Sequence, residues 1–140
     1  MNYIETSVLV AALTTEAHTR RAERFLTANG ADDLAISEWV VAEFSSALSM
    51  KLRGGTINME GRRAALAAVS ILIAQSLLLL EVTGPHFRTA ARFLDQHRLG
   101  LRAPDALHLA IASEQGAVLC TLDKRLARAG AALGVATELI

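Results

Sequence analysis

Four acidic residues stand where the apolar pattern of the chain predicts buried or strand-end positions rather than a solvated face. They are Glu5, Glu43, Asp105 and Asp123. A carboxylate without an opposite charge is costly to desolvate, so such groups protonate, pair with a cation or bind a metal. Hard divalent cations such as Mg²⁺ take oxygen ligands, including carboxylates. The four residues therefore indicate a divalent-metal site, provided that the fold brings them together.

Three of these acids also have a structural explanation when each is taken alone. Glu5 and Asp123 each follow a predicted strand and precede a predicted helix, and Asp105 follows Pro104 at a helix start. Acidic side chains are favoured at helix N-termini as caps and as partners of the helix dipole. Both interpretations stay open for these three positions.

Glu43 is harder to explain as a surface residue. Its neighbours at helical spacing on one face are Trp39, Val40, Ala47 and Met50. All four are apolar, so the carboxylate is expected to point into the protein or into a cleft. The alternative to a site role is an ion pair with an arginine from a neighbouring element.

Two further polar residues lie close to these acids in the sequence. Thr121 precedes Asp123 by two residues, so on a strand it shares the face of that acid, as a site hydroxyl or as an ordinary strand threonine. His108 lies one helical turn after Asp105. It could be a ligand or general base, but its apolar neighbours favour a hydrogen-bonded packing role.

Strands that alternate with helices must position these residues. Strands are predicted at residues 3–4, 34–36, 77–82, 117–122 and 135–139, and helices at 8–13, 18–28, 38–53, 59–76, 85–97, 105–115 and 124–129. The alternation indicates a parallel sheet with helices on both faces. Ligands of open parallel sheets bind beyond the carboxyl ends of the strands, where Glu5 and Asp123 fall.

Several element boundaries carry specific expectations. Ser37 and Asn58 are expected to cap the helices that follow them, and Thr6 or Ser7 to cap the first helix. Gly130 is expected to end the last helix. The strand at 77–82 reads as an interior strand. Residues 64–80 are apolar nearly all round, which indicates burial in a homodimer interface or in a two-sided core, and they are too short and polar for a comfortable membrane span.

Composition limits the class of protein. The 140 residues suit one domain over residues 1–140, with 52% hydrophobic residues and acids and bases balanced at 14 each. Twelve arginines against two lysines are compatible with a phosphate-bearing substrate. One cysteine and no signal-peptide pattern at the start favour a cytoplasmic protein without disulfides.

Four sequence segments around the acids match a known family in their order and spacing. They are YIETSVLVAAL at the start, SEWVVAEFSSAL around Glu43, APDALHLAIA around Asp105 and VLCTLDKRLARAG around Asp123. Together they closely resemble the PIN-domain ribonucleases, and within these the VapC (virulence-associated protein C) toxins of bacterial toxin–antitoxin pairs. The resemblance spans essentially the whole chain.

The resemblance implies an α/β PIN-like fold, with a parallel sheet of four to five short strands flanked by helices on both faces. It also implies metal-dependent hydrolysis of RNA with Mg²⁺ or Mn²⁺. The implied metal ligands and catalytic residues are Glu5, Glu43, Asp105 and Asp123, with Thr6 and Thr121 as hydroxyl helpers. Implied partners are a second copy of the chain and a small antitoxin, with operator DNA contacted only through the antitoxin.

The first acid departs from the family pattern, which typically has Asp where this chain has Glu5. The extra methylene carries the carboxylate about 1.3 to 1.5 Å further from the backbone. Mg²⁺ demands near-octahedral geometry and tolerates such displacement poorly. The alternative is therefore a catalytically impaired PIN fold that acts as an antitoxin-binding or RNA-binding module.

Overall fold

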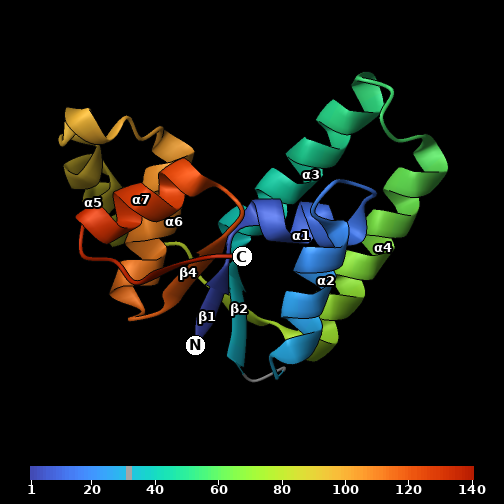
Figure 1. The fold of residues 1–140 in the computed structure, drawn as a ribbon, viewed down its shortest axis with the longest axis horizontal. Helices are drawn as coiled ribbons and strands as arrows, with labels where there is room; N and C mark the ends of the chain where they lie inside the picture. The colour runs from blue at the N-terminus through green and yellow to red at the C-terminus, as the bar shows by residue number, and fades with distance from the viewer. Residues whose placement is uncertain (31–32) are drawn as a thin grey trace.

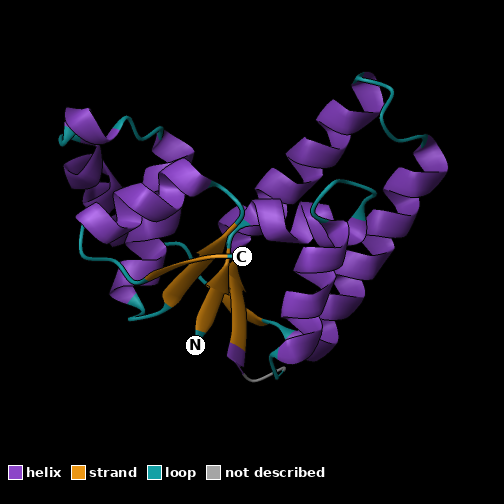
Figure 2. Ribbon diagram, viewed as in Figure 1, coloured by secondary structure: helices purple, strands orange, loops and turns teal. Residues whose placement is uncertain are grey.

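A five-stranded sheet forms the centre of the protein, with all of its paired strands parallel (Figures 1 and 2). The computed structural model describes residues 1–30 and 33–140. The strands are β1 (Asn2–Ile4), β2 (Leu34–Ser37), β3 (Leu78–Leu80), β4 (Val118–Thr121) and β5 (Thr137–Leu139), in the spatial order β3-β2-β1-β4-β5. The predicted α/β fold with a parallel sheet is confirmed.

Helices cover both faces of the sheet, as predicted. They are α1 (Thr6–Leu13), α2 (Thr19–Ala28), α3 (Glu38–Arg53), α4 (Met59–Ser76), α5 (Gly84–Leu94), α6 (Ala103–Glu114) and α7 (Lys124–Ala132), with a short 3₁₀ helix η2 (His97–Leu99). Figure 1 shows α1 to α4 on one side of the strands and α5 to α7 on the other. The long helices α3 and α4 extend beyond the sheet as an antiparallel pair.

The helix starts mostly follow the sequence signals. Ser37 accepts the N–H of Val40 at 3.4 Å, and Asn58 accepts the N–H of Gly61 at 2.8 Å, so both predicted caps are confirmed. The expectation for α1 is wrong. The helix begins at Thr6, and its cap is Glu5, which accepts the N–H of Ser7 at 3.0 Å. The carboxylate reaches this donor because it directly precedes the first helical turn.

The three central strands make the core rigid at the edge where the acids lie. Tyr3 and Ile4 of β1, Ile36 of β2 and Leu119 of β4 have no exposed surface. Helix α6 is buried through seven consecutive residues, 106–112, because it packs against β4 on one side and α5 on the other. Burial on this scale fixes the strand ends that carry Glu5 and Asp123.

The prediction that residues 77–82 form an interior strand is wrong, and one of the two alternatives for residues 64–80 is excluded. Strand β3 lies at an edge of the sheet rather than in its interior, and Leu78 and Leu79 are 53% and 38% exposed. Helix α4 is covered on one face only, since Ile71 on its outer face is 55% exposed. The two-sided core is thereby excluded, and an apolar surface stays uncovered in the single chain. In residues 1–30 and 33–140, no helix is both long and apolar enough to span a membrane.

The last helix does not end at Gly130, because that glycine lies inside α7 as a packing point. A Cβ atom at Gly130 would lie 2.3 Å from Cγ2 of Thr137 and 2.8 Å from Cδ2 of Leu109. The turn that follows the helix instead uses Gly134, whose φ of 73° favours glycine. Gly130 therefore lets α7 approach β5 and α6 closely.

We expect Gly130→Ala to lower the free energy of unfolding by about 1 to 3 kcal/mol, since the methyl group overpacks this contact. Urea denaturation followed by circular dichroism measures the change. Gly61→Ala in α4 is the matched control, because its Cβ would meet only ordinary contacts at 3.4 Å or more. The control is expected to be neutral or stabilising by about 0.5 to 1 kcal/mol. Equal effects of the two substitutions would contradict the packing role of Gly130.

Candidate functional site

An open groove of about 790 Å³ lies at the carboxyl edge of the sheet. Its lining residues are Glu5, Thr6, Ser7, Val10, Glu16, His18, Glu43, Ser46, Ala47, Met50, Leu122, Asp123 and Lys124. From β1 the chain proceeds to β2 on one side, whereas β4 pairs with β1 on the other side. The groove thus lies at a topological switch point, where ligands of open parallel sheets bind.

Glu5 follows β1 and is held by three hydrogen bonds. Its Oε1 accepts the backbone N–H of Ser7 at 3.0 Å. Its Oε2 accepts the hydroxyl of Thr121 at 2.9 Å and also the hydroxyl of Ser7. Only 9% of the residue is exposed, so these donors compensate the burial of its carboxylate.

Ser7 and Thr121 tie this carboxylate to the end of β4. The hydroxyl oxygen of Ser7 accepts the N–H of Leu122 at 3.2 Å, and that of Thr121 accepts the N–H of Asp123 at 3.0 Å. The sequence singled out Thr121 as sharing the face of Asp123, whereas Ser7 was considered only as a helix cap. Its role across the sheet depends on the pairing of β1 with β4, which no local pattern reveals.

Glu43 projects from α3 into the same groove and makes two short contacts through one oxygen. Its Oε2 accepts the hydroxyl of Thr6 at 2.6 Å and lies 2.6 Å from Nε2 of His108. The predicted cleft-facing position is confirmed, and the partner is a histidine rather than an arginine. Both of these contacts are to Oε2, and no hydrogen bond to Oε1 of Glu43 occurs within the described part of the chain.

The pKa of Glu43 reflects opposing influences. Burial favours the neutral acid, but the hydrogen bonds from His108 and from the hydroxyl of Thr6 outweigh burial and lower the pKa of Glu43 below its ordinary value. The indole N–H of Trp39 also lowers the pKa of Glu43, although this N–H forms no hydrogen bond with any described residue. Glu43 is thus a carboxylate at neutral pH.

Asp123 lines the groove and also caps α7. Its Oδ1 accepts the N–H groups of Arg125 and Leu126 at 2.7 and 3.2 Å. The capping explanation is therefore correct for Asp123, but it does not exclude a site role, because the same side chain borders the groove together with Glu5 and Glu43.

Asp105 is not among the described residues that line the groove. Its Oδ2 accepts the N–H of Arg102 at 3.2 Å and lies 3.9 Å from Nε of that arginine. The described residues that could share a metal ion are Glu5, Glu43 and His108, each with one ligand atom within 4.8 Å of the others. The structure thus brings Glu5 and Glu43 together, places Asp123 in the same groove and gives Asp105 the role of a helix-start partner.

The donor set suits a hard divalent cation. Carboxylate oxygens from two elements converge beside a groove that is open to water, and such cations keep several waters while one or two carboxylates hold them. A softer site would need thiolates, but Cys120 is buried, and its burial, with the nearby Glu138, raises the pKa of its thiol to about 12. Glu5 and Glu43 are the carboxylates of this cluster, and Asp123 borders the same groove.

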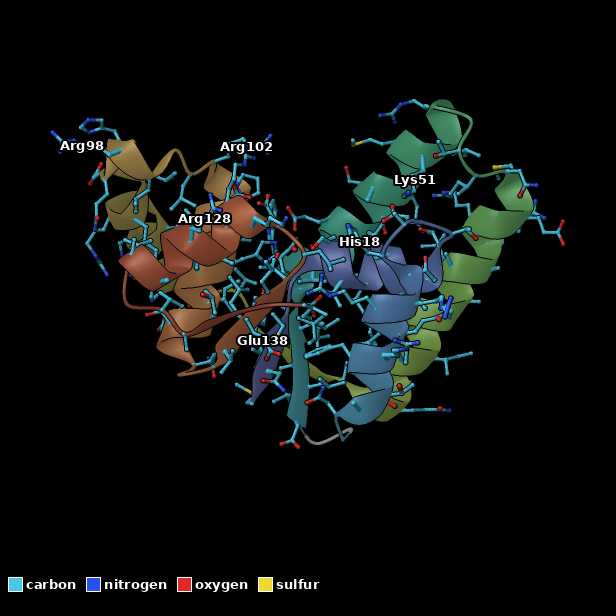
Figure 3. All side chains as sticks on the ribbon, in the orientation of Figure 1. His18, Lys51, Arg98, Arg102, Arg128 and Glu138 are labelled. Carbon is cyan, nitrogen blue, oxygen red and sulfur yellow. The ribbon has the colours of Figure 1, made fainter. Side chains whose placement is uncertain are left out.

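Basic side chains lie in and near the groove. Lys124 lines it from α7, and His18 lines it from the segment before α2. Lys51 of α3 forms an ion pair with Glu16, which also lines the groove. Figure 3 shows His18 and Lys51 on the side of α1 and α3, and Arg102 and Arg128 on the side of α6 and α7.

Comparisons with known proteins are consistent in fold. Residues 3–132 match the PIN domain family. No curated protein matches the sequence. Among solved structures, VapC20 of Mycobacterium tuberculosis, described as a Sarcin-Ricin loop cleaving toxin, superimposes with a TM-score of 0.73 at 22% identity, over 93% of this chain and 95% of that one.

Two similar structures are complexes by their descriptions. VapBC2 from Rickettsia felis, bound to a DNA fragment from the promoter, has a TM-score of 0.70 at 18% identity and covers 99% of this chain and 98% of its own. A toxin–antitoxin complex from Klebsiella pneumoniae has a TM-score of 0.63 at 15% identity, with coverage of 88% and 87%. At these identities the likeness shows the fold alone.

Proposed function

This chain belongs to the PIN domain family, and we propose that residues 1–140 act as one PIN domain that hydrolyses RNA with Mg²⁺ or Mn²⁺, as the toxin of a toxin–antitoxin pair. The observation that carries the proposal is the convergence of Glu5 and Glu43 beside Asp123 in an open groove at the switch point of the sheet. The description of VapC20 as a toxin that cleaves the Sarcin-Ricin loop supports the choice of RNA as substrate.

The carboxylates would bind the cation, and their hydrogen-bond partners would fix the position of the carboxylates. Glu43 offers its free Oε1, while Thr6 and His108 fix the other oxygen. Glu5 is fixed by Ser7 and Thr121. We include Asp105 as the fourth ligand of the loaded site, where its carboxylate would leave the N–H of Arg102.

A bound divalent cation supplies an activated water and offsets the charge that develops on the phosphate oxygens. The chain itself contributes orientation and phosphate binding. Lys124 borders the groove, and Arg125 follows it at the start of α7 with its side chain 70% exposed. Their cations would hold the phosphates that flank the cleaved bond, since nucleic-acid affinity derives largely from such contacts.

Partners follow from the same proposal. We propose a cognate antitoxin that occupies the groove, supported by the description of the Klebsiella complex. Operator DNA would be contacted only through the antitoxin, which the promoter-bound VapBC2 complex supports. The protein would act on RNA in the cytoplasm.

A second copy of the chain would cover the apolar surface of α4 and β3. Ile71 of α4 and Leu78 and Leu79 of the edge strand β3 are large apolar side chains that are exposed in the single chain. Exposed apolar patches on soluble domains mark interaction sites. We therefore propose that α4 contributes to a homodimer interface.

A second candidate function is a PIN fold that binds its partners without cleaving RNA. The observation that favours it is the state of Glu5, whose two oxygens are occupied by three hydrogen bonds from the scaffold. A cation would have to compete with these donors.

The nuclease proposal predicts that cleavage of RNA by the purified chain requires a divalent cation and stops with EDTA. Glu43→Gln, Asp123→Asn and Asp105→Asn should each lower the rate by about 100-fold or more, beyond what loss of an outer partner of a metal site usually costs. Glu114→Gln is the matched control, since this exposed acid of α6 pairs with His86 outside the groove. Cleavage that survives EDTA, or that Glu43→Gln leaves unchanged, would exclude the mechanism.

Glu5→Asp separates the two candidate functions. If Glu5 is a competent ligand, the shorter side chain should change the cleavage rate by less than about tenfold, because Asp can retain the cap of α1. A gain of about 100-fold or more, a difference of about 2.7 kcal/mol in barrier height, would show that the native chain is impaired. Rates are measured on one RNA substrate at saturating Mg²⁺.

The dimer proposal predicts that Ile71→Glu converts the chain from two copies to one, because a charge would be buried at the interface. Light scattering coupled to gel filtration gives the mass. Ala131→Glu adds the same charge at an exposed position of α7 and should leave the mass unchanged. A wild-type chain of monomer mass, or a dimeric Ile71→Glu variant, would refute the role of α4.

A further inference from the structure

A chain of hydrogen bonds runs from the interior of the sheet to Glu43. His108 of α6 is 2% exposed, and its Nε2 lies 2.6 Å from Oε2 of Glu43. Its Nδ1 lies 3.0 Å from the hydroxyl of Tyr3, whose ring is tilted against the imidazole with the centroids 5.9 Å apart. The Tyr3 hydroxyl also lies 2.7 Å from Oγ of Ser37, which accepts the N–H of Val40.

One arrangement of hydrogens gives every donor in this chain of hydrogen bonds an acceptor. While Ser37 accepts the N–H of Val40, its own hydroxyl donates to Tyr3, and Tyr3 then donates to Nδ1 of His108. Nε2 of His108 then carries the hydrogen that points at Glu43. In this arrangement every donor has an acceptor, as expected for buried polar groups.

Tyr3 is fixed in place beside His108. It is fully buried in β1, so the core holds its hydroxyl at the contact with Nδ1 of His108.

We propose that His108, oriented by Tyr3, is a positioning residue that fixes one oxygen of Glu43 and leaves the other for the divalent cation. This inference rests on the proposed function, because it assigns a task to residues beside the proposed metal site. The proposed effect of His108 is on the affinity of the site, and the residue does not touch the RNA.

Ligation of the cation by His108 itself is the competing explanation, since the imidazole lies within the cluster of potential ligand atoms. Both ring nitrogens are already engaged, however, and Nε2 is directed at a carboxylate oxygen rather than at the groove. His108 is also not among the residues that line the groove. Imidazole binds transition metals in preference to Mg²⁺, so the two explanations predict different metal selectivity.

The test measures the affinity of the whole chain for Mn²⁺ by electron paramagnetic resonance and for Mg²⁺ by calorimetry. His108→Leu should weaken both ions by a similar factor of about 10 to 100, and Tyr3→Phe by about tenfold, as expected for outer partners of a metal site. His108→Gln should recover part of the loss, because its amide nitrogen can donate to Glu43.

His86→Leu is the matched control for the loss of a buried imidazole. His86 is 3% exposed, its Nδ1 accepts the N–H of Thr83 at 2.9 Å, and its Nε2 lies 3.2 Å from Glu114. Neither His86 nor Glu114 is among the residues that line the groove. The control should lose stability on heating but bind Mn²⁺ within about twofold of the wild type, because distant sites act independently.

Each outcome decides between the explanations. Unchanged binding by both His108→Leu and Tyr3→Phe would overturn the positioning role while leaving the metal site intact. A loss confined to Mn²⁺ would overturn it in favour of ligation by His108. If the wild-type chain binds neither ion, the proposed function fails, and the positioning role fails with it.

Discussion

The site depends on one constraint, which is that carboxylates can be held at a buried strand end only if the surrounding chain supplies them with donors. Glu5 and Glu43 satisfy it in different ways. Glu5 uses both of its oxygens on donors from the first turn of α1 and from β4. Glu43 concentrates its donors on Oε2, from Thr6 and His108. Glu5 thus has more hydrogen-bond partners than Glu43, and its oxygens are less available to a ligand.

The parallel order of the sheet makes these donors meet. Because β1 lies between β2 and β4, the residues that follow β1 can reach the end of β4, and Tyr3 within β1 can reach α6 and the end of β2. The catalytic proposal and the positioning role of His108 therefore share one scaffold. A change that loosens α6 or β1 in the core is expected to disturb Glu43 before it unfolds the domain.

Local signals in the sequence predicted the helices and strands and the class of fold. Apolar runs and capping residues such as Ser37 and Asn58 predicted the elements and their alternation, because these features act over a few residues. The errors arose where tertiary contacts decide. Gly130 resembles a helix terminator in the sequence, but the close approach of Thr137 requires it. Strand β3 is apolar like an interior strand, yet it pairs with β2 alone and so lies at the edge of the sheet.

For the site, the sequence identified Glu43 from its apolar surroundings and favoured a hydrogen-bonded role for His108. It could not identify Ser7 or Tyr3 as partners, because those contacts cross from one strand to another. Anomalous diffraction from crystals soaked in Mn²⁺ tests the central claim most directly. The account predicts one peak in the groove, beside Oε1 of Glu43 and the carboxylate of Asp123. No peak there, or a peak held elsewhere on the chain, would contradict it.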